Sequence, residues 1–449
     1  MKKILIANRG EIARRIIRTC NRLGIETIAV HSEADGELPY VSEATESVLI
    51  GPNPVVQSYL QADKIIEQAK QRNADAIHPG YGLLSENADF ARKVEEAGMI
   101  FVGPASHIIE KMGDKIEARR TMIAAGVPVV PGTEEGVRSL EEAVIEAKRI
   151  GYPVMLKASA GGGGIGMVRC ENEQALSQQF ESVKNRAKAY FGDDVVFLEK
   201  FIQTARHIEV QVFGDASGGV VHLFERNCSV QRRNQKVIEE APSPALAGNV
   251  RTELCEAAVQ AAKAVGYTNA GTVEFILDED SNFYFLEMNT RLQVEHPVTE
   301  EITGFDLVEW QINVARGESL PPQETIQADN HAIEYRIYAE DPKTFMPSPG
   351  LLERITWGED ARIETGYEAG NRVTPFYDPM IAKVIITGAS REEALNKSHE
   401  FFAQTDIAGV KTNLPLFREF TESQIFEAGD YTTASLAEWL ITKKEAQQS

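Results

Sequence analysis

The sequence has too little positive charge for a protein that grips nucleic acid. Among its 449 residues, 46 Lys and Arg stand against 67 Asp and Glu, which gives a formal net charge of −21. No block of basic residues, and no set of aromatic residues interleaved with basic ones, offsets this acidity. Nucleic-acid-binding domains carry a basic patch on one face. We therefore predict no nucleic-acid partner.

Long apolar runs and paired cysteines are lacking as well. No run approaches the roughly 20 apolar residues that span a bilayer, and MKKILIANRGE at the start has too few for a signal peptide. We therefore predict no membrane association and a cytoplasmic location. The four cysteines form no CxxC pair, which indicates reduced thiols rather than a disulfide or zinc framework. They are Cys20, Cys170, Cys228 and Cys255.

Two common nucleotide-binding motifs are also absent. The first expected turn, in residues 1–24, lacks GxGxxG, and GxxxxGK[ST] does not occur. What is present indicates an α/β protein of two to four domains, because strands such as KKILIA and ETIAVHS alternate with helices. HPGYGLLSEN (78–87) follows one of these strands, where open parallel sheets place their ligands. A plain Gly/Pro turn is an equal alternative for it.

A glycine run lies in a small α/β unit that we expect over residues 133–202. In YPVMLKASAGGGGIGMVRC it stands between two hydrophobic strands, four residues after Lys157. Glycine loops let backbone N–H groups approach phosphates, and a lysine adds charge. We therefore predict a loop that covers phosphates, with a flexible linker as the alternative. The next strand, 195–202, is expected at a sheet edge, where its backbone could bind a purine.

The stretch Asn282–Glu300, NFYFLEMNTRLQVEHPVTE, carries the strongest chemical signal. Its odd positions from 287 to 295 are polar, and in an extended chain they would share one face. A solvated face of an amphipathic strand is the alternative. In the hairpin with 271–277, a turn centred between Asp280 and Ser281 puts Glu274 opposite Glu287. Facing carboxylates need a positive charge between them, and oxygen ligands suit Mg²⁺ or Mn²⁺. With Asn289 they predict a metal site, provided that the register is right.

Taken together, a glycine lid, scattered lysines and a carboxylate metal site indicate a nucleotide triphosphate clasped between two sheets. Eight motifs, which follow one another in order over nearly the whole chain, narrow this interpretation to one family. The sequence closely resembles biotin carboxylase, the ATP-grasp subunit of bacterial acetyl-CoA carboxylase and related acyl-CoA carboxylases. The motifs are IANRGEIARRI, HPGYGLLSEN, MGDK, MLKASAGGGGIGM, HIEVQV, QRRNQK, EMNTRLQVEHPVTE and MPSPG.

This resemblance implies a mixed α/β and α+β ATP-grasp fold. We expect a Rossmann-like N-terminal domain with a parallel sheet (1–113), an ATP-grasp region (114–320) with its lid at about 133–202, and a strand-rich C-terminal domain (330–449). The implied reaction carboxylates biotin with bicarbonate through carboxyphosphate, using ATP and Mg²⁺ or Mn²⁺. The implied partners are a biotin carboxyl carrier protein, carboxyltransferase subunits of an enzyme of fatty acid metabolism, and a second copy in a homodimer. Because the chain has no Met-Lys-Met, we expect its biotin on a separate carrier.

The resemblance also implies a role for each matching residue. Lys115 and Lys157 contact the phosphates of ATP under Gly163 and Gly164, Glu199, Lys200, Phe201 and Ile202 hold adenine, and His207, Gln231 and Asn234 flank the nucleotide. Glu274, Glu287 and Asn289 bind the metal, Lys236, Arg291 and Val294 hold bicarbonate, Glu295 is the general base, and Arg336 faces biotin. In this scheme Glu295 takes the proton of bicarbonate, and Arg336 stabilises the enolate-like ureido oxygen of biotin.

Two positions depart from the family pattern. Ile165 stands where many members have Arg, so the lid loses one phosphate contact, and Asn234 stands where many have His. Asn234 can still donate from its amide, without charge. Two other functions remain as alternatives. One is another ATP-grasp ligase, against which VEHPVTE and Arg336 argue. The other is a catalytically silent relative, against which the intact set from Glu274 to Glu295 argues.

Overall fold

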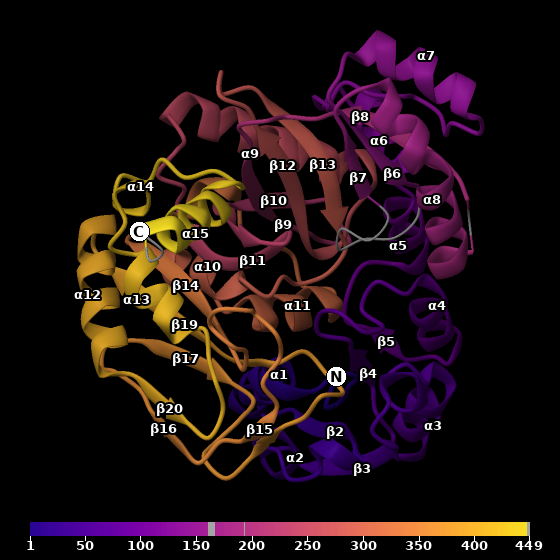
Figure 1. The fold of residues 1–449 in the computed structure, drawn as a ribbon. Coiled ribbons are helices and arrows are strands. Elements are labelled where there is room, and N and C mark those ends of the chain that lie inside the picture. Colours follow the sequence, from indigo (N-terminus) through magenta and orange to yellow (C-terminus); the bar gives the residue numbers. More distant parts are fainter. Residues whose placement is uncertain (160–166, 193, 447–449) are drawn as a thin grey trace.

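A computed structural model describes residues 1–159, 167–192 and 194–446. The first part of the chain forms a five-stranded sheet in the order β3-β2-β1-β4-β5, with every pair parallel (Figure 1). This confirms the predicted N-terminal parallel sheet. Its strands are β1 (Lys3–Ile6), β2 (Glu26–Ser32), β3 (Glu46–Gly51), β4 (Ala76–His78) and β5 (Ile100–Phe101). Its helices are α1 (Gly10–Arg22), α2 (Pro39–Glu43), α3 (Ala62–Gln71), α4 (Ala88–Glu96) and α5 (Ser106–Gly113).

The lid region has a sheet and a core of its own. Its three strands lie in the order β7-β6-β8 and are antiparallel, so β8 comes last in the strand order, but residues 131–137 hydrogen-bond to its outer side, where we expected an open edge. Leu156, Phe180 and Leu198 are fully buried between this sheet and its helices. The elements are α6 (Lys115–Ala124), which precedes the sheet, then α7 (Leu140–Ile150), β6 (Val154–Ala158), β7 (Met167–Cys170), α8 (Glu173–Phe191) and β8 (Val196–Lys200).

The largest sheet has eight antiparallel strands in the order β13-β12-β9-β10-β11-β14-β19-β17. Because β14 pairs with β11, the C-terminal strands continue the ATP-grasp sheet instead of forming a sheet apart, and the division expected between 320 and 330 falls inside one sheet. The strands are β9 (Arg206–Gly214), β10 (Val220–Arg232), β11 (Gln235–Ala241), β12 (Asn269–Leu277), β13 (Phe283–Asn289), β14 (His331–Tyr338), β17 (Arg362–Thr365) and β19 (Met380–Gly388).

Alternation along β9 separates the two faces of this sheet. Ile208, Val210 and Val212 lie in one core with α9 (Gly248–Ala264), whereas Phe213 joins the core of α11 (Leu307–Ala315) on the other side. On that second face Arg226 donates to Thr299 of α10 (His296–Thr303) at 2.8 Å. α10 therefore packs on this second face over β10 and β11, and the candidate base Glu295 is the residue that precedes this helix.

The end of the chain covers the C-terminal strands with helices and aromatic side chains. Tyr335 of β14 packs edge-on against Phe402 and Phe417, with ring centroids 4.8 and 5.4 Å apart. The remaining elements are two short sheets, β15 (Gly350–Leu351) with β18 (Arg372–Val373) and β16 (Arg354–Thr356) with β20 (Asp406–Ala408), then α12 (Arg391–Gln404), α13 (Leu414–Phe420), α14 (Gln424–Glu427) and α15 (Ser435–Ala446).

The β12–β13 hairpin confirms one part of the sequence argument and corrects two. Glu274 does lie opposite Glu287. The turn, however, is not centred where we expected, because Leu277 pairs with Phe283. That pairing alone would set Glu274 opposite Leu286, and a bulge at Leu286 restores the predicted partner. The predicted long strand was also wrong in its extent. β13 ends at Asn289, so a loop and α10, rather than one strand face, place the residues from 291 to 295.

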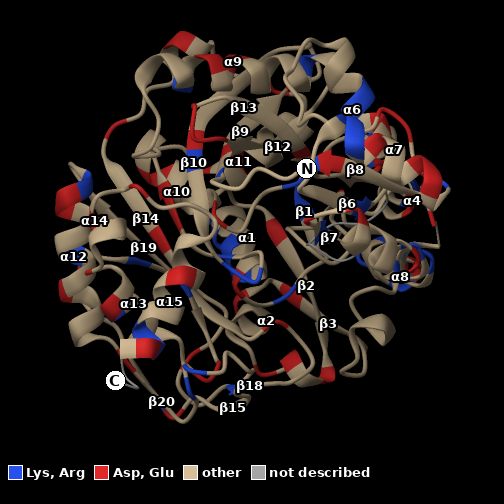
Figure 2. Cartoon of the chain, turned by 45° about the horizontal axis from the view of Figure 1, so that its top comes forward, with Lys and Arg blue, Asp and Glu red and all other residues tan. Residues whose placement is uncertain are grey.

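Among the described residues, no helix is long and apolar enough to cross a membrane. Acidic and basic residues lie interspersed along outer helices such as α9 and α12 (Figure 2). This surface agrees with the acidic composition.

Candidate active site

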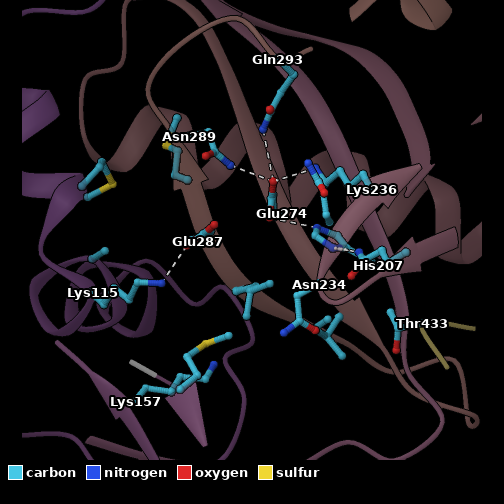
Figure 3. A pocket seen from close by; sticks show the side chains of 18 of the residues that line it. Lys115, Lys157, His207, Asn234, Lys236, Glu274, Glu287, Asn289, Gln293 and Thr433 are labelled. Carbon is cyan, nitrogen blue, oxygen red and sulfur yellow. Dashed lines mark hydrogen bonds and ion pairs between the residues drawn. The ribbon is translucent and has the colours of Figure 1, made fainter. Parts of the chain in front are cut away.

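A cavity of roughly 840 Å³ opens between the three-stranded sheet and the eight-stranded sheet (Figure 3). This is within the usual range of ligand pockets, about 300–1,000 Å³. Every described residue predicted for the site lines it. These are Lys115, Lys157, Glu199, Lys200, Phe201, Ile202, His207, Gln231, Asn234, Lys236, Glu274, Glu287, Asn289, Arg291, Val294, Glu295 and Arg336. Gly163, Gly164 and Ile165 lie outside the described residues.

The two predicted phosphate lysines meet carboxylates from different elements. Lys115 is the first residue of α6, and its Nζ lies 2.9 Å from Oε2 of Glu287 on β13. Lys157 on β6 pairs with Glu199 on β8, to which Arg119 also donates at 3.3 Å. Burial lowers the pKa of Lys115, but Glu287 outweighs this and raises it overall. Each lysine is therefore held in an ion pair, from which an anionic phosphate could displace the carboxylate.

The adenine end differs from expectation in one side chain. Lys200 lies in the cavity wall, yet its Nζ donates to the carbonyls of Gly151 and Tyr152 at 2.8 and 3.1 Å. Its ammonium group is thus used to hold the start of β6. Phe201 is covered by the guanidinium of Arg169, 4.2 Å from its ring centroid. Phe201 and Ile202, which follow the lid sheet, line the cavity as well.

Glu274 is the centre of the polar face (Figure 3). Its Oε1 accepts from Asn289 at 2.8 Å, Lys236 at 3.0 Å and Gln293 at 3.2 Å. Its Oε2 lies 2.9 Å from Nε2 of His207. Burial would raise the pKa of this carboxyl, but Lys236 and His207 overcome it and hold the pKa far below its usual range. Glu274 is therefore a fixed negative charge.

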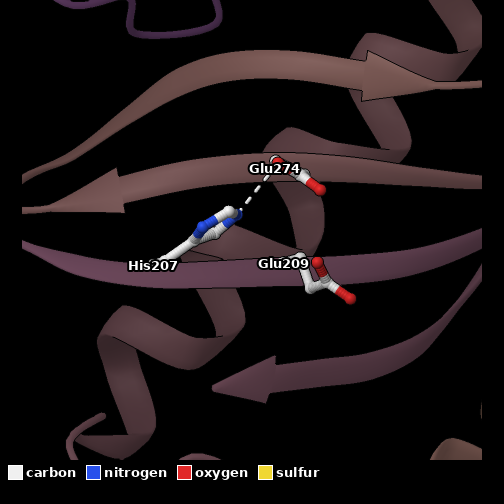
Figure 4. A group of neighbouring side chains, drawn as sticks. All are labelled: His207, Glu209 and Glu274. Atoms are coloured by element: carbon white, nitrogen blue, oxygen red, sulfur yellow. Dashed lines mark ion pairs between the residues drawn. The ribbon is translucent and has the colours of Figure 1, made fainter. Parts of the chain in front are cut away.

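The donor set of the predicted metal site fits a hard cation. Glu274 and Glu287 stand on adjacent strands facing one cavity, and Asn289 keeps its Oδ1 in a contact with Arg291 at 3.1 Å. A second cluster, His207 with Glu209 and Glu274, also has ligand atoms within 4.8 Å of one another (Figure 4). Glu209, however, is already paired by Arg226 at 2.6 Å and Lys236 at 2.5 Å. We therefore assign that cluster to an ion-pair network.

Two cations predicted for bicarbonate lie on either side of Glu274. Lys236 contacts Glu209 at 2.5 Å and Glu295 at 2.6 Å in addition to Glu274. Arg291 is aimed by Glu86 at 2.8 Å and by Gln293 at 2.8 Å. Val294 follows in the same loop, and its carbonyl accepts from the buried Lys383 at 2.7 Å.

Glu295 lies between two cations at the start of α10. Its Oε1 is 2.6 Å from Lys236 and its Oε2 is 2.9 Å from Nη2 of Arg336 on β14. Burial would raise its pKa, yet Lys236 and Arg336 together hold the pKa well below its usual range. The sequence placed this residue correctly at the site although its path there was not the predicted strand.

The turn between β10 and β11 explains why Asn234 suits its position. Arg232 pairs with Gln235, so Arg233 and Asn234 form a two-residue turn, with φ of 52° and 63°. Hairpin turns of this kind need positive φ at both positions, which Asn tolerates well. Nearby, Gln231 Nε2 lies 2.9 Å from Nδ1 of His207. All three predicted neighbours of the nucleotide thus share the cavity.

Several supporting residues escaped the sequence argument. Glu209 and Arg226 are both completely buried. Glu209 pairs with Lys236 on one side and with Arg226 on the other, and Glu86 orients Arg291. Arg119 supports Glu199. HIEVQV and HPGYGLLSEN contain two of them, and the alternation of HIEVQV puts Glu209 on the same face as His207. This alternation is the sequence signal for Glu209.

ATP-grasp enzymes hold a phosphate-binding cavity between a small sheet and a large antiparallel sheet. This protein has that arrangement, so it belongs to the ATP-grasp class. Family models agree along the chain. "Biotin carboxylase, N-terminal domain" matches residues 1–109, "Carbamoyl-phosphate synthase L chain, ATP binding domain" matches 114–323, and "Biotin carboxylase C-terminal domain" matches 334–438.

Individual relatives agree over their full length. Biotin carboxylase 2 of Bacillus subtilis (strain 168) is 57% identical over 441 residues, which are 98% of this chain and 99% of the relative. A Campylobacter jejuni biotin carboxylase-beta-gamma-ATP complex superposes with a TM-score of 0.96 at 45% identity, covering 97% of this chain and 98% of that one. The biotin carboxylase domain dimer of Hydrogenobacter thermophilus 2-oxoglutarate carboxylase, in complex with MgADP, ADP and bicarbonate, has a TM-score of 0.95 at 48% identity, covering 97% of each chain.

The chain belongs to the biotin carboxylase family. It is an ATP-dependent ligase that carboxylates biotin with bicarbonate. Of the alternatives left open by the sequence, another ATP-grasp ligase and a catalytically silent relative are therefore set aside.

Proposed function

We propose that Glu295 is the general base of this carboxylase and that its two cationic neighbours control when it acts. The supporting observation is its position between Lys236 and Arg336. While both cations pair with it, they hold the pKa of Glu295 well below its usual range, which makes the carboxylate a weaker base. Bicarbonate held by Lys236 and Arg291 would draw Lys236 away, and biotin would draw Arg336 away. Each loss raises the basicity of the carboxylate.

For the phosphoryl transfer, Lys115 and Lys157 hold and neutralise the phosphates of ATP. Glu274, Glu287 and Asn289 would hold Mg²⁺ or Mn²⁺, which would supply charge neutralisation during the transfer. With phosphate bound, Lys115 would leave Glu287, and this carboxylate would then be available to the metal. The lid sheet shields the product, carboxyphosphate, from water.

For the second step, Arg336 stabilises the negative ureido oxygen of biotin after the phosphate released from carboxyphosphate has removed the N1 proton. A guanidinium held in place beforehand costs little reorganisation when charge develops. Arg336 is only 7% exposed and stands in the cavity wall, so its charge acts in a site that excludes most water.

The decisive assay is ATP hydrolysis by the pure chain, measured with and without bicarbonate and biotin. Release of ADP that depends on both would support these assignments. Hydrolysis that ignores both substrates would contradict them.

A variant of Glu287 tests the metal site. Glu287→Gln keeps the shape but loses the charge, so we expect at least about a tenfold loss of Mg²⁺ or Mn²⁺ affinity, because even outer partners of a metal site cost about 10- to 100-fold. Excess metal should restore part of the activity. The measurement is the metal dependence of carboxylation. Glu279→Gln, an exposed change in the turn of the same hairpin, is the control. An unaltered metal requirement in Glu287→Gln would remove this residue from the site.

We further propose that the biotin is carried by a separate biotin carboxyl carrier protein, that carboxyltransferase subunits complete the complex, and that the chain forms a homodimer. The relative from Hydrogenobacter thermophilus is described as a dimer, and no Met-Lys-Met occurs in the sequence. The cytoplasmic location remains a prediction.

A docked carrier raises the effective concentration of biotin, so adding a biotinylated carrier should increase turnover severalfold over free biotin. Biotin found on the chain's own lysines by mass spectrometry, with full activity and no carrier, would contradict this. Light scattering tests the dimer.

A further inference from the structure

Two carboxylates lie behind the active site with no assigned role. Glu239 on β11 stands directly opposite Glu334 on β14, and both are completely buried. They project to the same side as Ala241 and Ala332, which pack with α10. The pair is therefore sealed under the helix that begins beside Glu295.

Glu239 contacts the residue that we assign to biotin. Nη2 of Arg336 lies 2.6 Å from Oε1 of Glu239 and 2.9 Å from Oε2 of Glu295. One nitrogen therefore bridges the general base and a carboxylate that lies deeper in the fold. When the base turns to bicarbonate, Glu239 is the anion that stays with the guanidinium.

Glu334 has no comparable partner. Neither of its oxygens meets a hydrogen-bond donor among the described residues. Lys383 on β19 lies opposite Arg336 rather than Glu334, and it donates to the Val294 carbonyl at 2.7 Å and pairs with Glu11 at 3.0 Å. The charged and titratable groups around the pair are Lys236 on β11, Arg336 on β14, Lys383 on β19, Glu295 at α10, and Glu11 and Tyr81 from the N-terminal domain.

These contacts leave more buried acid than buried base. Like charges that face each other across strands destabilise a sheet, and an unpaired buried carboxylate is costly, so such a group takes up a proton instead. Burial raises the pKa of both carboxyls, and for Glu334 neither Lys383 nor Arg336 offsets it. Glu239 differs in keeping its ion pair with Arg336, although burial still raises the pKa of its carboxyl to about 7.

We propose that Glu239 is a positioning residue for Arg336 and that Glu334, opposite it, is a neutral carboxylic acid. A neutral Glu334 leaves Arg336 with one inner counter-anion, so that its remaining hydrogen-bonding capacity points to the cavity. The first half of this proposal rests on the proposed role of Arg336 toward biotin. The second half does not, since it concerns a proton that is present without any substrate.

Infrared spectroscopy of the full chain tests the proton directly. A neutral carboxylic acid has a carbonyl band apart from the amide and carboxylate bands, and ¹³C-labelled glutamate should shift it. We expect this band in the wild type near neutral pH, its loss in Glu334→Gln, and its retention in the exposed control Glu400→Gln. If Glu334→Gln does not fold, Glu334→Asp should move the band. A wild type without the band, or a band indifferent to both changes, would overturn the proposal.

The pH dependence of unfolding gives a second readout of the proton. A carboxyl with a raised pKa in the folded state keeps its proton there while the unfolded chain loses it, so stability falls as pH rises above the unfolded pKa, about 4.3. Between this pH and the folded pKa, the wild type should lose melting temperature relative to Glu334→Gln, whose amide cannot titrate. If the melting temperatures of the two proteins change with pH in the same way, this would contradict a neutral Glu334.

Kinetics test the positioning role. In Glu239→Gln the guanidinium loses its inner anion, and losing one partner of a buried charge pair typically costs at least about 30-fold. We expect this loss in kcat/KM for free biotin, a smaller one in Glu334→Gln, and little change in the KM for ATP, which binds at the other end of the cavity. If the kinetic constants for biotin and for ATP deteriorate equally, or if neither changes, the positioning role is overturned. A wild type that fails to use biotin would instead refute the proposed function and leave the infrared result standing.

Discussion

Glu295→Gln should carboxylate biotin about 100- to 10,000-fold more slowly than the wild type, the usual contribution of a general base. The amide has the size and shape of the carboxylate but cannot accept the proton of bicarbonate. It also cannot pair as an anion with Lys236 and Arg336, whose nitrogens lie 2.6 and 2.9 Å from the native oxygens. Bicarbonate should therefore still find its cations while the proton transfer fails.

The measurements are kcat for carboxylation and, separately, nucleotide affinity, which should persist because ATP contacts other residues. Glu301→Gln is the matched control, since Glu301 is on the same helix and pairs with Arg362 at 3.1 Å, outside the cavity. It should leave turnover close to that of the wild type. An undiminished kcat in Glu295→Gln would remove this residue from the role of base.

The second large effect is expected for Arg336→Gln, which should slow carboxylation of biotin by about 100- to 1,000-fold, the typical cost of removing one donor to a developing oxyanion. The change also leaves Glu239 without its 2.6 Å contact and Glu295 with Lys236 alone. Without Arg336, the pKa of Glu295 rises toward its usual range, because one of the two cations that lower it is gone.

The measurement is kcat/KM for biotin, with the pH profile of turnover as a second signature. The exposed Arg354→Gln, which breaks only a surface pair with Asp406, is the control. Adding Glu239→Gln to Arg336→Gln removes the buried charge left without a partner, so the double variant should regain folding stability but not biotin turnover. If Arg336→Gln processed biotin normally, the ureido oxygen would need another donor.

The metal hairpin shows how a correct prediction can depend on an unseen detail. Summing positions around the turn identified Glu274 and Glu287 as partners, and they are. The turn itself is tighter than assumed, and only the bulge at Leu286 brings Glu287 back into line. A bulge inserts one residue with little sequence signal of its own, so periodicity could suggest the pair but could not locate the irregularity that creates it.

Side-chain direction was equally hidden where tertiary contacts decide it. Lys200 was assigned to the nucleotide from its place in a motif, but the start of β6 offers two carbonyls that its ammonium group can reach. Glu209 and Arg226 were overlooked because buried ion pairs across neighbouring strands depend on register, which a single strand does not reveal.

The sequence by itself determined the family, the parallel N-terminal sheet, the small lid unit, and the site residues, every described one of which lines the cavity. It could do so because motif spacing and hydrophobic alternation are local properties of the chain. Only the tertiary structure decided which charges meet. Lys236 on β11 reaches Glu295 at the start of α10, and Arg336 on β14 contacts Glu295 as well. Glu239 lies behind both cations. The balance of buried acids and bases, and with it the protonation of the site, exists only once these strands have paired.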